Sequence, residues 1–521
     1  MHISAGKTVA KTLQVRFSKY LWAVLTALVI LVGELWRLGA ANPWWDEGWT
    51  LMVARIWVER GFYGRLLNGE LAPPGLEAAF PTTRLVALSF RWFGVGLWQG
   101  RLPIVVCTLV ALALFFWLAR QLYDVRIAWA TVFVALLTPV HPLLNPLLMG
   151  RQVMAEMPML AFLLAGYVCF FQVLKSRRWW LLPAILFWGL GVRTKLQAVP
   201  FWTLSLFVPL VVCVFQRRWH MAKLLAIGLS GTVLITWLVP LGQAWLLAGR
   251  TAPPAALPDL FAVTAIVPRL DVRLFALKTT FTDGLLPFLG LAYAAWRFGW
   301  RDRWQLAIPS AVVRCMWLVF AGSWFVWFAS LSVGWERYLF PATFAASVFV
   351  AAFLAELTYN FDLQATLRQL AKSLQQRRLQ RASVAGLAAI MLIAATLPLA
   401  AETLYRAYIL EPNQSAVQTA AFLNSSTAAN TRIETYESEL FFFLQRPYHF
   451  PPDEIHVALD RQMVLKQPMP THYAPLAAQP DVVVIGSFSR MWKLYDALPS
   501  APNFRLVRSF GMYDIYERID H

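Results

Sequence analysis

Two adjacent carboxylates, Asp46 and Glu47, follow the first long apolar stretch of the chain, in the segment Asn42-Pro-Trp-Trp-Asp-Glu-Gly-Trp49. Pro43 and Gly48 are expected to interrupt a helix here, and the tryptophans are typical of the layer where a bilayer meets water. A carboxylate held at that depth could act as a general base. The same pattern also fits an interfacial loop whose acidic side chains are hydrated, and both interpretations stay open at this point.

Cationic side chains stand in three later connections that are expected on the same side of the membrane. They are Arg151, Arg193 with Lys195, and Arg337, which is followed by Tyr338. Lysine and arginine are disfavoured at the outer ends of spans. An anionic phosphate would explain them, because arginine holds it with two parallel hydrogen bonds and lysine as a point charge. Snorkelling, or pairing with Glu156 and Glu336, is the alternative explanation.

The composition shows which kind of protein must position these groups. Of 521 residues, 59% are hydrophobic and only 14% are charged, and the chain carries 25 tryptophans and 36 phenylalanines. This balance is that of a polytopic membrane protein and excludes an ordinary soluble domain. The net charge of +18 comes from basic clusters between apolar runs, which is the positive-inside pattern, and no nucleic-acid motif accompanies them. The four cysteines lie inside apolar runs, so no disulfide is expected.

Apolar runs of about 20 residues, the length that a hydrocarbon core of about 30 Å requires, predict about eleven transmembrane helices. The first covers 20–36, and the others are expected near 102–121, 127–144, 156–174, 179–193, 197–215, 224–247, 283–297, 305–329, 339–357 and 384–401. The basic clusters between them fall on the side of the N-terminus, so this side is expected to be cytoplasmic. An odd number of spans puts the C-terminus outside. We expect a multi-pass protein of the inner (plasma) membrane.

Two regions between the spans are expected to lie along the membrane surface. About sixty residues after the first span are interrupted by glycine and proline, and 51–58 and 85–93 are expected to be surface helices in a large, structured outer loop. The run 363–381 combines regularly spaced leucines with arginine, lysine and glutamine. It predicts an amphipathic helix on the cytoplasmic surface.

After residue 404 the composition changes, which predicts a transmembrane domain over 1–404 and a small extracytoplasmic α/β domain over 405–521. In the second, 414–423 has helical spacing, 432–436 and 481–486 are expected strands, and 504–510 pairs with 512–518 through Gly511. This domain carries no nucleophile–base signature and no glycine-rich phosphate loop. We interpret it as a lid or an acceptor-docking module.

In this order, the motifs resemble those of membrane glycosyltransferases with the GT-C fold. The resemblance is to the bacterial members of the family 39-like superfamily of protein O-mannosyltransferases and lipid A aminoarabinose transferases. It covers about residues 20–350 and rests on Asp46-Glu47, Pro73-Pro-Gly75, 93–103, 151–158, Thr194-Lys195 and Arg337-Tyr338 with Pro341. Glu156 stands where many relatives have aspartate, and the sequence shows none of the β-trefoil of the eukaryotic mannosyltransferases.

The resemblance implies an inverting glycosyltransferase that moves a sugar from a polyprenyl-phosphate donor to a hydroxyl group of a lipid, glycan or protein acceptor on the extracytoplasmic side. It implies Asp46 as the general base, with Glu47 and Glu156 in support. The residues that it implies for the donor phosphate are Arg151, Arg193, Lys195, Arg337 and Tyr338. No cofactor is expected, and we prefer a metal-free site, although Asp46 and Glu47 could also bind a divalent metal ion.

Two other classes of protein remain open. A polytopic transporter or flippase of a lipid-linked or anionic substrate would also combine many spans with charged residues. It is expected to show repeated halves and charges near the membrane midplane, and the sequence shows neither. A structural or sensory membrane protein would leave the carboxylates of the outer loop replaceable. A bound polyprenyl phosphate beside Asp46 would separate a transferase from a transporter.

Overall fold

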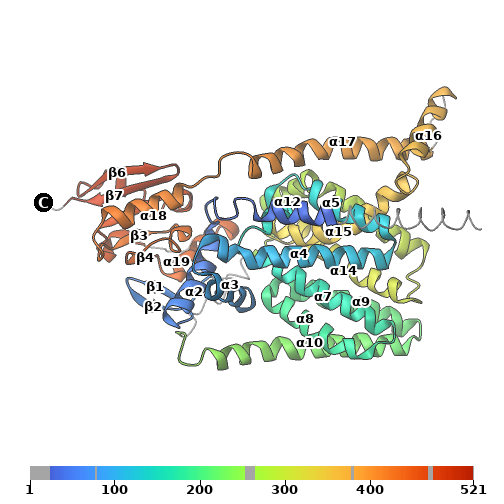
Figure 1. Cartoon of the computed structure of the whole chain (residues 1–521), viewed down its shortest axis with the longest axis horizontal. Helices are drawn as coiled ribbons and strands as arrows, with labels where there is room; N and C mark the ends of the chain where they lie inside the picture. The colour runs from blue at the N-terminus through green and yellow to red at the C-terminus, as the bar shows by residue number, and fades with distance from the viewer. Residues whose placement is uncertain (1–23, 77–78, 253–263, 377–380, 468–472, 520–521) are drawn as a thin grey trace, which may run out of the picture.

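The computed structural model describes residues 24–76, 79–252, 264–376, 381–467 and 473–519 of the 521-residue chain. Long helices run side by side along the long axis of the molecule (Figure 1). A small sheet lies at one end of them, together with α2 (Trp45–Arg60) and α3 (Phe80–Phe93). The chain therefore has a helical body and a mixed α/β end.

The helical body begins with Val24–Leu35, the described part of the first expected span, whose residues 20–23 lie outside the described residues. The other helices of the body follow in chain order. They are α4 (Leu97–Leu122), α5 (Val125–Leu137), α6 (Pro146–Met149), α7 (Glu156–Leu174), α8 (Leu181–Thr194), α9 (Val199–Phe215), α10 (Trp219–Leu246), α12 (Leu270–Thr282), α13 (Leu285–Ala294), α14 (Pro309–Ser330), α15 (Glu336–Leu357), α16 (Leu363–Gln375) and α17 (Arg381–Tyr408).

Seven helices in the described part of the chain are long and apolar enough to cross a membrane, namely α4, α7, α9, α10, α14, α15 and α17. The remaining expected spans are also helical but shorter. They are Val24–Leu35, α5, α8, and α13, which continues as the π-helix η4 (Ala295–Arg301). The chain is thus built as a multi-pass membrane protein, and the count of eleven spans stays a prediction.

α15 lies at the centre of the helical body. Almost all of its apolar stretch is buried, whereas α10 and α17 keep most of theirs on the surface. Small residues such as Ala342 and Ala345 let neighbouring helices approach α15 closely. An added Cβ at Gly290 of α13 would lie 2.6 Å from the backbone nitrogen of Val350. Such close packing holds α15 in place, and the first turn of this helix carries Arg337.

The end of the helical body away from the sheet is rich in basic residues. Lys175, after α7, donates a hydrogen bond to Gln121 near the end of α4, at 3.1 Å. Gln216, after α9, donates to the carbonyl oxygen of Trp304, before α14, at 2.7 Å. The helix α16 also lies at this end (Figure 1). The structure therefore gathers at one end the basic clusters that the positive-inside pattern assigns to one side of the membrane.

α2 begins at Trp45, so the two adjacent carboxylates lie in the first turn of a helix and not in a loop. The prediction that Gly48 interrupts the helix is wrong. An added Cβ at Gly48 would lie 2.2 Å from the carbonyl oxygen of Ser438, so the glycine permits close packing between α2 and the C-terminal region. Of the three tryptophans expected in the interfacial layer, Trp45 and Trp49 are buried and only Trp44 is exposed. The expected surface helices 51–58 and 85–93 are parts of α2 and α3.

The C-terminal region forms a five-stranded sheet with the strand order β4-β3-β5-β7-β6. Its strands are β3 (Ile433–Thr435), β4 (Tyr448–His449), β5 (Val482–Ile485), β6 (Phe504–Phe510) and β7 (Tyr513–Arg518). β3 runs parallel to β4 and β5, and β7 runs antiparallel to β5 and β6. Gly511, with a φ of 55°, makes the predicted turn between β6 and β7.

The helices of this region pack beside the sheet, and one of them was predicted. The expected helix at 414–423 is α18 (Ser415–Ser426), whereas α19 (Asp453–Asp460), α20 (Ser487–Met491) and β4 had no sequence prediction. Trp45, Trp49 and Met52 of α2 belong to the same buried cluster as the sheet residues. The hairpin of β1 (Arg65–Leu67) and β2 (Glu70–Ala72) adds a buried ion pair between Arg65 and Asp453, at 3.1 Å. The domain boundary at residue 404 falls within α17 and stays a prediction.

Candidate active site

The side chain of Glu47 links three elements of the candidate site through hydrogen bonds. Its side chain is fully buried, and Oε1 and Oε2 accept from Arg101 Nε and Nη2 at 2.8 and 2.9 Å. Oε1 also accepts from the backbone N–H of Val153 at 3.1 Å. Oε2 accepts from the backbone N–H of Trp44 at 3.0 Å, as the third residue of a capped helix does. Glu47 therefore joins α2, α4 and the segment before α7.

Arg101, to which the sequence motifs assigned no role, completes this anchor. Its other N–H groups donate to the carbonyl oxygens of Leu38, Ala41 and Asn42 at 2.8, 3.1 and 3.1 Å. All five guanidinium donors are thereby used. The sequence feature that could have indicated this role is the position of Arg101 at the start of an apolar run. Arg101 holds the loop that leads into α2, and so it holds Asp46 in place.

Asp46 lies in the same helical turn as Glu47 but faces Arg337, in the first turn of α15. Arg337 Nη1 donates to Asp46 Oδ2 within an ion pair. The side chain of Asp46 is 30% exposed and that of Arg337 is 19% exposed. This pair is therefore accessible to solvent, in contrast to the buried Glu47. An accessible guanidinium can exchange a carboxylate for another anion.

A second ion pair stands beside the first. Lys195 Nζ, just after α8, lies 2.7 Å from Oε1 of Glu156, which is buried in the first turn of α7. The ring of Tyr338 lies between the two pairs, because its centre is 5.5 Å from Lys195 Nζ and 5.2 Å from the guanidinium carbon of Arg337. Of the predicted site residues, the structure brings together Asp46, Glu156, Lys195, Arg337 and Tyr338.

Three helices begin at this group of residues. α2 begins at Trp45, α7 at Glu156 and α15 at Glu336. The first turn of a helix has N–H groups without helical partners and a partial positive charge, so it stabilises an anion. The carboxylates of Asp46, Glu47 and Glu156 are the anions in the first turns of α2 and α7. The same field would stabilise a phosphate.

The two other predicted cations, Arg193 and Arg151, differ in their hydrogen bonds. Arg193, in the last turn of α8, is partly buried, and its Nε has no hydrogen-bond acceptor among the described residues. Arg151 does not join the group, because it donates to the carbonyl oxygens of Gly33 and Trp36 near the end of the first helix. Its guanidinium also stacks over the ring of Tyr408, at 4.7 Å. Arg193 thus keeps a donor for an anion, whereas Arg151 links the first helix to α17.

The C-terminal region adds a carboxyl group that the sequence motifs missed. Asp460, the last residue of α19, is buried, and its Oδ2 lies 3.4 Å from His456 Nε2. Burial raises the pKa of Asp460 to about 7, and the Arg337 guanidinium acts against this rise. No spacing or motif separates Asp460 from the other acids of this region in the sequence.

The two carboxylates that could bind a divalent metal ion each have a cationic partner. Asp46 is paired with Arg337, and Glu47 is paired with Arg101. Within the described residues, no group of three or more histidine, cysteine, aspartate or glutamate side chains could hold a metal ion. Arginine and lysine next to an accessible carboxylate are instead the groups that stabilise a phosphate.

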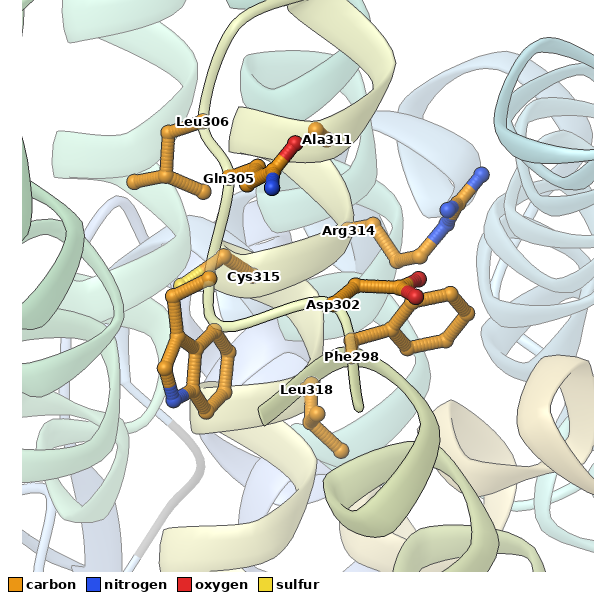
Figure 2. Close-up of a pocket in the computed structure, with 9 residues that line it drawn as sticks. Phe298, Asp302, Gln305, Leu306, Ala311, Arg314, Cys315 and Leu318 are labelled. Atoms are coloured by element: carbon orange, nitrogen blue, oxygen red, sulfur yellow. The ribbon is translucent and has the colours of Figure 1, made fainter. Parts of the chain in front are cut away.

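Cavities also occur away from this group. One, of about 60 Å³, lies at the basic end between η4 and the start of α14, with Phe298, Asp302 and Arg314 in its lining (Figure 2). Another, of about 190 Å³, is mostly apolar and lies between α5, α13, α15 and α17. Thr343, in the lining of the second cavity, follows Arg337 by about two turns of α15. The lining of the larger cavity thus reaches α15 beyond Arg337 and contains none of the predicted site residues.

Comparison with known proteins supports this description at the level of the fold. The family described as dolichyl-phosphate-mannose-protein mannosyltransferase matches residues 82–241. This segment runs from α3 to α10 and includes Glu156 and Lys195. No curated protein matches the chain.

Solved structures are similar to the chain over most of its length. ArnT from Cupriavidus metallidurans in the apo state has a TM-score of 0.59 at 17% identity, over 96% of this chain and 98% of ArnT. ArnT bound to undecaprenyl phosphate has a TM-score of 0.57 at 18% identity, over the same shares. The Archaeoglobus fulgidus oligosaccharyltransferase AglB, with an inhibitory peptide and a dolichol-phosphate, has 0.52 at 13%, over 91% of this chain and 70% of AglB. The chain therefore has the GT-C fold, and the resemblance predicted from its motifs is confirmed.

Proposed function

We propose that this protein is an inverting glycosyltransferase that moves a sugar from a polyprenyl-phosphate donor to a hydroxyl group of a lipid, glycan or protein acceptor on the extracytoplasmic side of the inner (plasma) membrane. The observation that carries the proposal is the pair of Asp46 and Arg337, an accessible carboxylate in contact with a cation that suits a phosphate. The GT-C fold supports the class of enzyme, and the ArnT complex with undecaprenyl phosphate supports this class of donor.

Donor binding begins with an exchange of partners. Without a donor, Arg337 is paired with Asp46, and Lys195 is paired with Glu156. The phosphate of the donor is an anion with several acceptor oxygens, so it attracts both cations and the first turn of α15. Arg193 adds a donor through its Nε, which has no hydrogen-bond acceptor in the described part of the chain. The exchange leaves Asp46 as an ionised carboxylate without its cation, which makes it a better base.

The transfer step combines one proton movement with one displacement. Asp46 accepts the proton of the acceptor hydroxyl while the hydroxyl oxygen attacks the anomeric carbon from the face opposite the phosphate. The bond between the anomeric carbon and the phosphate oxygen breaks, and its electron pair stays on the departing polyprenyl phosphate. Arg337 and Lys195 stabilise the negative charge that develops there. Attack from the opposite face inverts the configuration of the sugar.

The apolar cavity between α5, α13, α15 and α17 supports a lipid-linked donor. It lies about two helical turns along α15 from Arg337, inside the helical body. An isoprenoid chain gains free energy when it leaves water for an apolar surface. A donor with its phosphate at Arg337 and the start of its lipid in this cavity would keep the sugar at the accessible side of the pair.

The proposal is tested by Asp46→Asn in protein reconstituted with a panel of undecaprenyl-phosphate sugars and acceptors. Asparagine keeps the shape but removes the basic lone pair, so release of undecaprenyl phosphate should fall by about 10²–10⁴-fold. Asp302→Asn is the matched control, since it makes the same change in the Arg297 ion pair at the basic end, and it should keep full transfer.

Near-normal transfer by the folded Asp46→Asn protein would show that Asp46 is not the base, and Glu156 would be tested next. Passage of the lipid-linked sugar across vesicles without release of undecaprenyl phosphate would favour the transporter. Purified protein that binds neither a lipid-linked sugar nor a polyprenyl phosphate would overturn the proposal as a whole.

A further inference from the structure

Of the three tryptophans around Asp46, Trp44 is the one that solvent can reach. Trp44 is 41% exposed, whereas Trp45 and Trp49 are 6% and 0% exposed. Trp44 precedes Asp46 by two residues, so their Cα atoms lie within about 7 Å of each other. A large aromatic ring with an open surface therefore stands next to the proposed base.

The position of Trp44 is fixed by the same anchor that holds α2. Its backbone N–H donates to Oε2 of Glu47 at 3.0 Å, and Glu47 is paired with the buried Arg101. The ring of Trp44 packs edge to face with the ring of Phe488 in α20, with ring centres 5.9 Å apart. A ring that is already held in place loses little conformational entropy when a ligand binds to it.

Phe488 is the contribution of the C-terminal region to this surface, and it is held as firmly. Glu437 Oε1 accepts from the backbone N–H of Ser489 at 2.8 Å, and its Oε2 accepts from that of Phe488 at 3.3 Å. The ring of Phe488 also packs on Trp45, with ring centres 5.4 Å apart. Trp44 and Phe488 thus form a fixed aromatic pair to which both parts of the chain contribute.

We propose that the acceptor of this enzyme is a sugar, whose ring stacks on Trp44 while one of its hydroxyl groups reaches Asp46. The inference rests on the proposed function, in which Asp46 accepts the proton of the acceptor hydroxyl. The face of an indole ring carries partial negative charge. The C–H groups on one face of a pyranose are apolar and carry partial positive charge, so they pack well against such a face. The hydroxyl groups at the rim of the sugar stay free to react.

The short separation of Trp44 and Asp46 favours a sugar over the other two kinds of acceptor. A pyranose that lies on Trp44 spans this separation with a single ring, because its hydroxyl groups project from the edge of the ring. A serine or threonine hydroxyl has no flat C–H face beside it. The chain of a lipid alcohol gains more free energy in an apolar cavity than on a ring that is open to water.

Contact with lipid headgroups is the other explanation for an exposed tryptophan at this end of the molecule. Trp98, at the start of α4, allows the two explanations to be separated. It is 45% exposed and packs on Phe93, with ring centres 6.3 Å apart. An added Cβ at Gly39 would lie 3.2 Å from Cβ of Trp98, so this ring also stands beside the loop that leads into α2. Trp98→Ala is therefore the matched control for Trp44→Ala.

The first experiment measures binding of methyl pyranosides to the full-length protein in nanodiscs, by transfer of magnetisation from aromatic protons in NMR spectra. In the wild type, the protons on one face of the sugar should receive most of the magnetisation. Trp44→Ala should weaken binding by about tenfold. Trp44→Phe should lose less, because it keeps a smaller aromatic face. Trp98→Ala should bind as the wild type does, and so should Asp46→Asn, because stacking does not need the base.

The second experiment follows release of undecaprenyl phosphate from undecaprenyl-phosphate sugars, with methyl pyranosides, a serine-containing peptide or geraniol as the acceptor. The pyranosides should be the preferred acceptors. Trp44→Ala should raise the KM for the pyranoside by about tenfold, and it should leave kcat and the KM for the donor unchanged. Trp98→Ala should change none of these constants.

Equal losses in Trp44→Ala and Trp98→Ala would assign both rings to the headgroup layer and overturn the inference. Preferred transfer to the peptide or to geraniol would also overturn it and would leave the proposed function intact. A lower kcat at unchanged KM would show that Trp44 only positions α2. If Trp44→Ala does not fold, Trp44→Phe decides, because unchanged pyranoside binding in that protein contradicts stacking. Binding that depends on Trp44, without any release of undecaprenyl phosphate by the wild type, would instead contradict the proposed transfer.

Discussion

Asp46 and Glu47 are neighbours in the chain, but their side chains leave the first turn of α2 in different directions and meet different arginines. Glu47 is fully buried and holds Arg101, so a change in its charge acts on the scaffold. Asp46 is 30% exposed and forms an ion pair with Arg337, so a change in its charge affects any ligand that binds at this pair. Asp46 can take part in a reaction because Glu47 fixes the position of the helix that carries both residues.

Glu47→Gln is expected to destabilise the protein strongly. The substitution leaves the buried Arg101 guanidinium without its counter-charge, which costs about 3–5 kcal/mol when one partner of a buried pair is removed. Thermal unfolding in detergent should show a large downward shift. Glu59→Gln on the same helix removes a more exposed pair with Arg55 and should cost less than about 1 kcal/mol. Equal stability of the two variants would contradict the role of Glu47 as an anchor.

At the scale of elements, α2 links the helical body to the C-terminal region. Asn42, just before α2, donates to Ser415 Oγ at 3.1 Å and accepts from the backbone N–H of Ala416 at 3.1 Å. Ser438 donates its hydroxyl hydrogen to the carbonyl oxygen of Trp45. The position of α2, and therefore of Asp46, depends on contacts with residues that follow it by several hundred positions in the chain.

Gly48→Ala is expected to disturb this contact. The added Cβ would lie 2.2 Å from the carbonyl oxygen of Ser438 and 2.7 Å from Cα of Glu439, and backbone atoms cannot rotate away. The cost should be about 1–3 kcal/mol, the usual range for overpacking, seen as a lower unfolding temperature. Gly242→Ala in α10 is the control, because among the described residues no atom outside the glycine's own stretch of helix lies within 4 Å of its added Cβ. A helical Gly→Ala change alone stabilises by about 0.5–1 kcal/mol, so the two variants should shift in opposite directions.

At the scale of the whole molecule, the two ends of the helical body differ in their basic residues. The candidate site and the sheet lie at one end, and the basic clusters with α16 lie at the other (Figure 1). Positively charged loops stay in the cytoplasm during membrane insertion. We therefore expect the site and the C-terminal region to face outward.

Single cysteines at the two ends test this orientation. Ser425→Cys in α18 and Gln364→Cys in α16 are both exposed positions. In intact spheroplasts, an impermeant maleimide should label only the cysteine at position 425, whereas both should react after the membrane is permeabilised. Labelling of position 364 alone in intact spheroplasts would reverse the orientation and place the candidate site in the cytoplasm.

Much of the candidate site could be predicted because the chemistry limits the residue types. An accessible carboxylate and several cations at the outer ends of spans identified Asp46, Glu156, Lys195 and Arg337, and the structure brings these four together. The prediction did not distinguish Arg337 from Arg151, since both are arginines after a turn. Only the folded chain shows that Arg151 bonds to carbonyl oxygens of the first helix while Arg337 faces Asp46.

The sequence by itself determined the membrane class, the positions of the long helices and the hairpin at Gly511, because hydrophobicity and local backbone preference act over short distances along the chain. The tertiary structure alone decided that Gly48 lies inside a helix and that Glu47 is an anchor for Arg101. These outcomes depend on contacts between segments far apart in the chain. Burial and pairing set the role of a charged side chain, and neither can be read from its immediate neighbours.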